Sequence, residues 1–257
     1  MAQALVINLT GVTATKSLGN ILDRAFAPSV TNGLEGWFNL GGSTATAVKN
    51  RAPGKADATA VGGPTFDVGG FANLKSLSTF FQTAITETAD MSILVACASA
   101  DTLASIATTP AFIGSGSGPS QADAGIASDG VIIFPAGTGV RMQGYRRASD
   151  GSQEQAYAVV GNQTPLTTFR CYLGRISGLN VYMKNMTSGA DAGTWSYTKP
   201  RYPSSLPLRI GSGYSSNAGT SKIAAVGIWS RALSDAEGAQ AYADMQAYLS
   251  KRWGLVI

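Results

Sequence analysis

The feature that most constrains the fold of this chain is a succession of short apolar segments separated by turn residues. The 257 residues include 31 glycines, and clusters of Gly, Ser, Asn, Asp or Pro recur after roughly every 8–15 residues. Short segments rich in β-branched and aromatic residues are typical of strands joined by tight turns. The pattern therefore predicts many short strands arranged as a sandwich or a barrel.

The predicted strands share an apolar or aromatic run that is bounded by turn residues. They are Leu34–Leu40, Thr65–Val68, Phe80–Thr83, Met91–Ala98, Pro110–Gly114, Gly125–Ala127, Val131–Phe134, Val140–Tyr145, Gln155–Val160, Thr168–Ile176, Leu179–Asn185, Trp195–Thr198, Leu206–Gly211 and Lys222–Ser230. Ser128-Asp129-Gly130 predicts a hairpin turn between two of them.

One helix is predicted near the C-terminus. Ser234 and Glu237 have the S-x-x-E spacing of a capping box, and Gly254 is a natural residue to end the helix. Five residues fall on one helical face: Ala241, Met245, Tyr248, Leu249 and Arg252. We expect this helix to pack on one side or edge of the strands.

The first 30 residues differ from the rest and are predicted to form an N-terminal arm before a single domain over residues 31–257. Two interpretations stay open: the arm docks onto a neighbouring subunit, or the apolar run Ala4–Leu9 adds an edge strand to its own domain. The first ten residues lack the basic and apolar regions of a signal peptide, and no run approaches 18 apolar residues. We therefore expect no membrane insertion.

The chain contains no histidine. A Ser-His-Asp triad, a Cys-His dyad and any zinc site that needs imidazole are thereby excluded. The net charge of +4 is a mild bias, and Arg141, Arg146 and Arg147 are interpreted as a solvated strand end, so no nucleic-acid partner is predicted. Cys97 and Cys171 lie in strand-like runs. Two buried free thiols are expected, while a disulfide between neighbouring strands stays open.

The C-terminal run Lys222–Leu255 resembles the end of concanavalin A-like lectin/glucanase domains, also called laminin-G-like jelly rolls. In that family a strand of the form I-A-x-V-x-I-W-x-R-A-L leads into S-x-x-E and a helix that ends Y-L-x-x-K-W/Y-G. The matching residues here are Ile223, Val226, Ile228, Trp229, Arg231, Ala232, Leu233, Tyr248, Leu249 and Trp253. Asn50–Phe66, and Phe80–Thr83 with Met91–Cys97, are similar to further family segments. The resemblance covers about Leu34–Leu255.

The resemblance implies an all-β, two-sheet antiparallel jelly-roll sandwich with a short C-terminal helix and an N-terminal arm. The Y-L-S-K-x-W-G form of the tail, together with a polar arm, is similar to domains of bacteriophage virion proteins, especially tail fibres and head decorations. In the hydrolytic branch of the family an E-x-D-x-x-E strand supplies the catalytic carboxylates. This chain has no such motif and only four glutamates: Glu35, Glu87, Glu154 and Glu237.

Calcium is used by many lectin-type members. Asp123 and Asp129 are the candidate ligands here, but they lack EF-hand spacing and are better explained as turn residues. No catalytic residue, cofactor or metal site is predicted.

Aromatic residues in a polar segment are the strongest candidate for a binding site. Sugar rings stack on aromatic faces, and amides and hydroxyls supply hydrogen bonds. The predicted glycan-binding residues in Gly193–Asn217 are Trp195, Tyr197, Tyr202, Tyr214 and Asn217. The alternative is that Trp195 and Tyr197 point into the core of the domain and that Tyr214 is a simple surface residue.

These observations predict a non-enzymatic bacteriophage virion protein, a tail-fibre-like module that attaches to host surface glycan. Its expected partners are other virion proteins and a host polysaccharide, and it is expected to form a homo-oligomer, with a trimer favoured. It would be made in the host bacterial cytoplasm and reside in the virion. One alternative is a capsid decoration or tail scaffold protein that acts by protein–protein contacts only. A third is a glycan hydrolase, testable by Glu35→Gln and Glu154→Gln.

Overall fold

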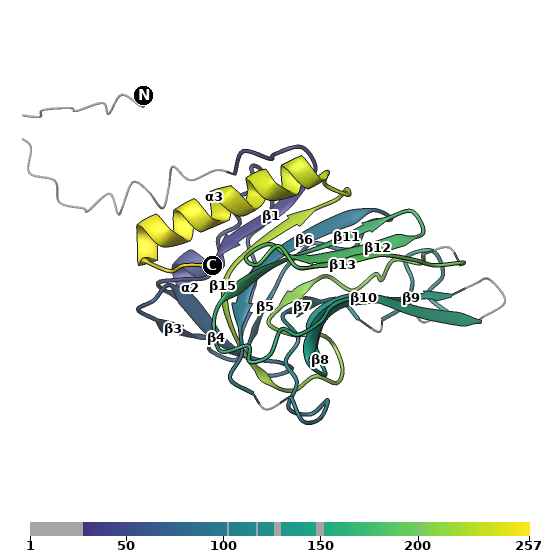
Figure 1. Ribbon diagram of the computed structural model, residues 1–257, viewed down its shortest axis with the longest axis horizontal. Coiled ribbons are helices and arrows are strands. Elements are labelled where there is room, and N and C mark those ends of the chain that lie inside the picture. Colours follow the sequence, from purple (N-terminus) through teal and green to yellow (C-terminus); the bar gives the residue numbers. More distant parts are fainter. Residues whose placement is uncertain (1–27, 102, 117, 126–129, 148–151, 200) are drawn as a thin grey trace, which may run out of the picture.

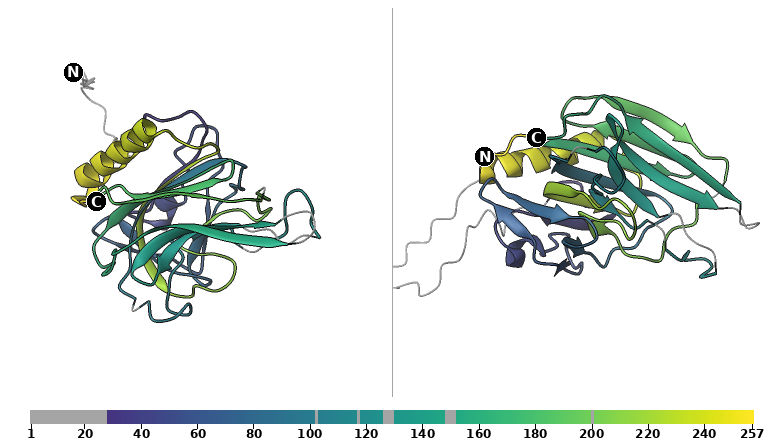
Figure 2. Two further views of the ribbon diagram at one scale, coloured as in Figure 1. Left: turned by 45° about the vertical axis from the view of Figure 1, so that its right-hand side comes forward. Right: turned by 90° about the horizontal axis from the view of Figure 1, so that it is seen from below.

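A computed structural model describes residues 28–101, 103–116, 118–125, 130–147, 152–199 and 201–257. These residues form two antiparallel sheets packed face to face, with a C-terminal helix on the outside of one sheet (Figure 1). Figure 2 shows the same layers from two further directions. The predicted two-sheet antiparallel sandwich with a C-terminal helix is confirmed.

Sheet A is the larger sheet, with strand order β13-β12-β11-β6-β15-β4-β3, and β1 pairs with the remaining length of β15. Its strands are β1 (Leu34–Asn39), β3 (Thr65–Asp67), β4 (Phe71–Lys75), β6 (Met91–Ala98), β11 (Arg170–Ser177), β12 (Asn180–Asn185), β13 (Asp191–Ser196) and β15 (Thr220–Trp229). A short helix, α2 (Thr44–Ala47), follows β1.

Sheet B has the strand order β10-β9-β8-β7-β14-β5-β2. Its strands are β2 (Thr59–Val61), β5 (Phe80–Gln82), β7 (Ile113–Gly114), β8 (Val131–Ala136), β9 (Gly139–Arg147), β10 (Gln153–Val160) and β14 (Arg209–Ile210). The core lies between the sheets, because alternate side chains of each strand face inward.

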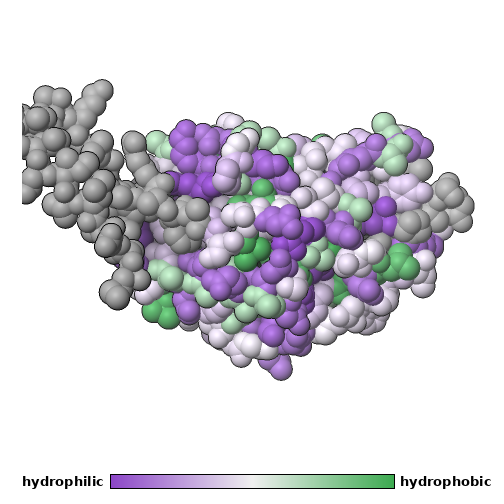
Figure 3. Space-filling model, turned by 90° about the horizontal axis from the view of Figure 1, so that it is seen from above, coloured by the Kyte–Doolittle hydropathy of each residue, from purple (hydrophilic) through white to green (hydrophobic). Residues whose placement is uncertain are grey.

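Helix α3 (Asp235–Trp253) covers part of the outer face of sheet A. Ser234 accepts a hydrogen bond from the Glu237 amide, and Gly254 ends the helix with a left-handed backbone at φ 67°, as the sequence predicts. The predicted apolar face is confirmed by the buried residues Ala241, Met245, Tyr248 and Leu249. Every residue of β6 is buried as a result, since the core covers one of its faces and the α3 layer covers the other. On the α3 side of the molecule, hydrophilic residues predominate and the hydrophobic ones form small separate patches (Figure 3).

A buried ion pair joins the loop between β5 and β6 to the loop between β13 and β14. The carboxylate of Glu87 pairs with the guanidinium of Arg201, and both side chains are almost fully buried. The same carboxylate accepts hydrogen bonds from the Ser115 hydroxyl and, at 2.7 Å, from the amide of Val131. A buried carboxylate needs an ion pair and hydrogen bonds to offset its lost hydration. Because these partners come from loops that are far apart in sequence, the Glu87 carboxylate holds those loops together.

Several strand predictions were wrong in detail. β2 and β4 were not predicted, because their short Ala- and Asn-containing runs have weak strand propensity. β13 begins at Asp191, before the predicted Trp195–Thr198, because pairing with β12 overrides the poor propensity of Asp and Gly. The predicted strands at Pro110 and Leu206 shrink to two residues each. The predicted strand Gly125–Ala127 and the hairpin turn at Ser128 lie largely outside the described residues.

The two cysteines lie on opposite faces of sheet A. Cys97 points into the core between the sheets, whereas Cys171 points toward α3, with its sulfur 3.8 Å from that of Met245. Both are free and buried, which confirms the first interpretation and excludes the disulfide in this arrangement. Burial raises the pKa of both thiols.

Among the described residues, no helix has both the length and the apolar character needed to cross a membrane. The predicted arm lies outside the described residues except for Pro28–Val30. Ser29 donates to the Asp244 carboxylate from its amide at 2.6 Å, and Val30 accepts from the Trp229 indole at 2.9 Å.

Candidate functional site

The outer face of sheet B carries its exposed aromatic residues at the β8–β9–β10 end. In these strands Ile133, Met142 and Ala158 point into the core. Strand alternation therefore places Phe134, Arg141 and Tyr157 on the outer face. The pairing register sets Phe134 directly opposite Arg141, and Tyr157 lies on the next strand.

These residues stack in sequence across three strands. The guanidinium carbon of Arg141 lies 4.4 Å from the ring centroid of Phe134 and 4.9 Å from that of Tyr157. The Tyr157 ring is in turn stacked on Trp195, with centroids 6.5 Å apart and planes 14° from parallel. We call Phe134, Arg141, Tyr157 and Trp195 the aromatic–arginine row. Cation–π and ring–ring contacts hold its members in one orientation.

The exposed end of this row consists of Tyr157 and Trp195. Their side chains are 42% and 57% exposed, whereas Phe134 is buried beneath the guanidinium. Trp195 comes from β13 of the other sheet, so the row bridges the two sheet edges. Two nearly parallel, partly exposed rings next to a fixed cation leave apolar ring surface on which a planar or sugar ligand can stack.

Two contacts hold Trp195 over the edge of sheet B. Tyr197, which follows Trp195 by two positions, is buried and donates its hydroxyl hydrogen to the Gly144 carbonyl at 2.9 Å. Glu154 of β10 accepts from the amides of Thr198 and Lys199, each at 2.9 Å. Burial raises the pKa of Glu154, but these hydrogen bonds outweigh it and hold the pKa below its ordinary value. The carboxylate is therefore charged at neutral pH and fixes the segment after β13.

A second stack lies on the same face, at β5 and β14. The Arg209 guanidinium carbon lies 3.5 Å from the ring centroid of Tyr214 and 4.5 Å from that of Phe80. Tyr214 donates its hydroxyl to the Pro207 carbonyl at 2.8 Å. The strand register places Arg209 and Tyr157 on one line across sheet B, with one paired residue on each strand between them. Four strand spacings separate the two residues, which corresponds to about 19 Å.

The predicted site residues are thus divided by the fold. Trp195 belongs to the exposed row, and Tyr214 belongs to the second stack. Tyr197 is buried beneath, as the alternative interpretation held, and Tyr202 is half-buried. Asn217 is buried in a left-handed backbone conformation at φ 48°, and its amide nitrogen has no hydrogen-bond partner among the described residues.

Sequence reasoning missed Phe134, Arg141 and Tyr157. The signal was the short turn at Gly137 between two strand-like runs, which fixes a hairpin register. That register pairs Phe134 with Arg141, so the arginine interpreted as a solvated strand end is half-buried between rings. Trp195 could not be added in the same way, because its contact with Tyr157 joins the edges of two different sheets.

Each of the four glutamates has a partner. Glu35 pairs with Lys55 at 2.6 Å, Glu87 with Arg201, and Glu237 with Arg231 at 2.5 Å, while Glu154 holds the segment after β13. Within the described ranges no three acidic or cysteine side chains come together as a metal site would require. Asp123 accepts from the Gly125 amide at 2.8 Å as a turn residue, and Asp129 lies outside those ranges.

Comparisons with known proteins bear on the fold alone. No family model matches the chain, and no curated relative is found. Among solved structures, the receptor-binding domain of botulinum neurotoxin D matches with a TM-score of 0.56 and 9% identity, over 84% of this chain and 53% of that one. The binding domain of botulinum neurotoxin DC in complex with SialylT matches with a TM-score of 0.58 and 10% identity, over 85% and 53%.

A third neighbour comes from a study of botulinum neurotoxin type C, whose cell entry depends on two ganglioside molecules. It matches with a TM-score of 0.57 and 10% identity, over 81% of this chain and 51% of that one. The chain thus spans about half the length of these neighbours. At this identity the likeness shows that the chain shares their β-sandwich fold.

Proposed function

We propose that this protein is a non-enzymatic glycan-binding module that uses the aromatic–arginine row. The observation that carries the proposal is the stacked, exposed pair Tyr157 and Trp195 beside the fixed guanidinium of Arg141. Large aromatic rings and arginine dominate the binding energy of many interfaces, and exposed rings of this kind present apolar faces at little conformational cost. The neighbours that bind SialylT or depend on gangliosides for entry support a binding role for this sandwich fold.

The finer proposal is that the module belongs to a bacteriophage virion and attaches it to a host surface polysaccharide. Its support is the resemblance of Lys222–Leu255 to concanavalin A-like domains of virion proteins. The arm, residues 1–30, would join it to other virion proteins or to its own copies, with a trimer favoured. Weak single sites would then act together, since linked copies bind far more strongly than one copy.

The test measures binding of the purified chain to lipopolysaccharide extracted from Gram-negative bacteria and to a panel of bacterial surface polysaccharides. We expect saturable binding by the unaltered protein and a loss of about tenfold or more in Trp195→Ala with Tyr157→Ala, since each stack contributes about 0.5–1.5 kcal/mol. The matched control is Val68→Ala, which shortens an exposed apolar side chain elsewhere.

Tyr214→Ala separates the two stacks on this face. If the exposed row is the site, this variant keeps most of the affinity. Binding that survives the Trp195 and Tyr157 changes but is lost in Tyr214→Ala would move the site to the second stack. A folded oligomer that binds none of the glycans would contradict the proposal and favour the scaffold or decoration role.

A further inference from the structure

A polar pocket lies on sheet A, at the end of the strand order opposite to β13 and the aromatic–arginine row. Its volume is about 370 Å³, and it is formed at the β3, β4 and β15 end of sheet A. Thr65, Asn73 and Lys222 are direct partners across the three strands. Because Ala72 and Ile223 point into the core, alternation places this trio on the outer face. Lys75 and Thr220 form the next pair along the same strands, about 7 Å away.

Some polar groups of this pocket form hydrogen bonds within the protein, and others are left to bind a ligand. Ser99 donates to the Thr220 carbonyl at 2.9 Å, Thr79 donates to the Gly62 carbonyl at 3.4 Å, and the Thr220 hydroxyl donates to Asp101 at 2.7 Å. These hydrogen bonds hold the lining residues Ser99, Thr79 and Thr220 in place. In contrast, the side chains of Thr65, Asn73, Lys75 and Lys222 make no hydrogen bond or ion pair with any described residue. Lys222 is positioned by the Phe71 ring, with its ammonium 5.3 Å from the centroid.

The charge of the pocket is positive. Two lysines line it, and no described carboxylate is among its lining residues. The adjacent carboxylates are engaged elsewhere: Asp101 accepts from the hydroxyl and amide of Thr220, and Asp67 accepts from the Gly69 amide at 2.8 Å. Ammonium, amide and hydroxyl donors together suit oxygen atoms that carry negative charge.

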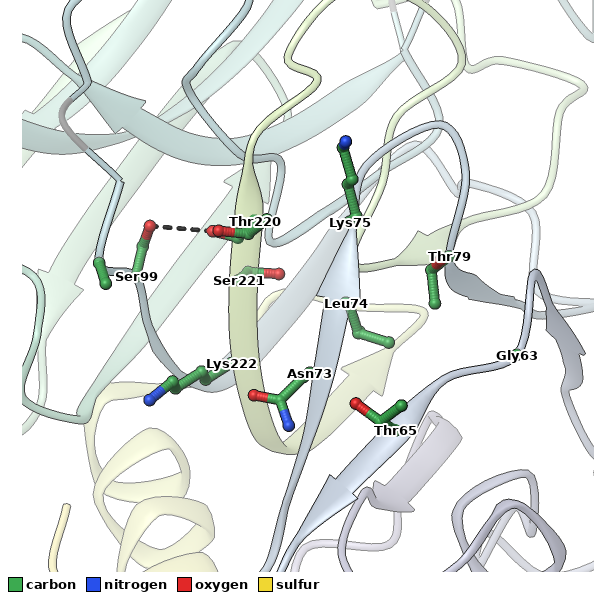
Figure 4. Close-up of a pocket in the computed structure, with 11 residues that line it drawn as sticks. Gly63, Thr65, Asn73, Leu74, Lys75, Thr79, Ser99, Thr220, Ser221 and Lys222 are labelled. Atoms are coloured by element: carbon green, nitrogen blue, oxygen red, sulfur yellow. Dashed lines mark hydrogen bonds between the residues drawn. The ribbon is translucent and has the colours of Figure 1, made fainter.

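The arrangement of the lysines indicates the size of the ligand. Figure 4 shows Thr65, Asn73 and Lys222 side by side, whereas Lys75 lies one step along β4 and its ammonium points away from that of Lys222. One small ion would not contact both ammonium groups in this arrangement. A chain with acidic groups at separated positions would contact both.

We propose that this pocket binds an acidic oligosaccharide. Lys222, Asn73 and Thr65 would contact one acidic sugar, and Lys75 would contact the next charged group along the chain. The inference goes beyond the proposed function, because the site lies at the opposite end of sheet A from Trp195 and uses charge and hydrogen bonds where the row uses stacking.

The experiment measures binding by calorimetry at low salt, with tetragalacturonic acid and a sulfated tetrasaccharide as probes. Fully methyl-esterified tetragalacturonate is the uncharged control ligand, and sodium phosphate is the single-ion control. We expect at least one of the two acidic probes to bind the unaltered protein. Lys222→Gln should weaken the affinity for that probe about tenfold, as expected for the loss of one charged hydrogen bond. The double variant Lys75→Gln with Lys222→Gln should bind neither probe.

Lys184→Gln is the matched control, since it makes the same charge change on β12. It should bind like the unaltered protein, which separates the pocket from general attraction to a basic chain. Trp195→Ala should also leave this binding unchanged, so failure of the aromatic–arginine row and failure of the pocket are distinguishable. The proposal is overturned if neither acidic probe binds, if the methyl ester binds equally well, if the folded double variant keeps its affinity, or if phosphate alone binds as tightly.

Discussion

The outer faces of the two sheets differ in what covers them. On sheet A, the α3 layer buries Trp37 and Trp229, whose two indoles pack edge to face with centroids 6.1 Å apart. On sheet B, no helix covers the strands described, and Tyr157 remains open to solvent together with Trp195, which reaches over from β13 at the edge of sheet A. Aromatic residues therefore occur on both faces, but their burial differs.

This difference suggests that the aromatic residues under α3 serve stability, whereas the exposed rings serve binding. A buried indole stabilises the fold because it removes apolar surface from water and contributes to the close packing of the core. An exposed pair of rings contributes little to folding, yet it offers the same surface to a ligand. Arg141 and Arg209 strengthen the contrast, because each guanidinium packs against one face of a ring that stays exposed or half-exposed.

The largest effect is expected where sheet A meets α3. Trp229→Ala should lower the free energy of unfolding by about 3–5 kcal/mol, because it leaves a cavity beneath the helix. It also removes the indole donor to the Val30 carbonyl. Urea unfolding followed by circular dichroism would measure this, with Trp229→Phe as a milder control. A loss below about 1 kcal/mol would show that α3 does not depend on this packing and would break the comparison.

The covered face was predictable from sequence, and the open face was not. The continuous apolar run of β6 and the capped periodic helix from Asp235 each carry a local signal that the fold preserves. Trp195 was chosen because it lies in a polar, aromatic segment. Its partner Tyr157 is 38 positions earlier in the chain, and only the meeting of β10 with β13 brings them together.

Short strands were missed for a related physical reason. The β4 residues Phe71–Lys75 form a strand because β15 and β3 pair with them on both sides. Their own propensity is modest, so tertiary pairing decides the structure. The pocket at Asn73 and Lys222 depends on that pairing and was therefore invisible to sequence patterns.

A smaller effect is expected from pH at the start of α3. Hydrogen bonds from Arg231, and then from the Ser234 amide, lower the pKa of Glu237 from 4.5 to about 2. The carboxylate thus stays charged in the folded protein at pH values where the unfolded chain binds a proton. Its contribution is fully present above about pH 4.5 and is lost as the pH falls toward 2.

Urea midpoints at pH 7, 4.5 and 3 would test this contribution. Glu237→Gln should lower the midpoint at pH 7, and the difference from the unaltered protein should shrink as the solution is acidified. Asp57 serves as a control, because its pKa is lowered by Lys49, which is not a partner of Glu237, and Asp57→Asn should not alter the Glu237 effect. Parallel curves for the unaltered and Glu237→Gln proteins would mean that this cap does not stabilise the covered face.

The smallest effect on stability is expected at the most exposed tryptophan. Trp195→Ala should change the free energy of unfolding by less than about 1 kcal/mol, since more than half of the side chain is already in water. A double-mutant cycle with Tyr157→Ala should give a coupling of about 0.5–1.5 kcal/mol, the worth of one ring contact. If Trp195→Ala instead destabilised the protein as much as Trp229→Ala, the row would be part of the core. A small loss of stability combined with a loss of glycan binding would assign the two tryptophans to different tasks.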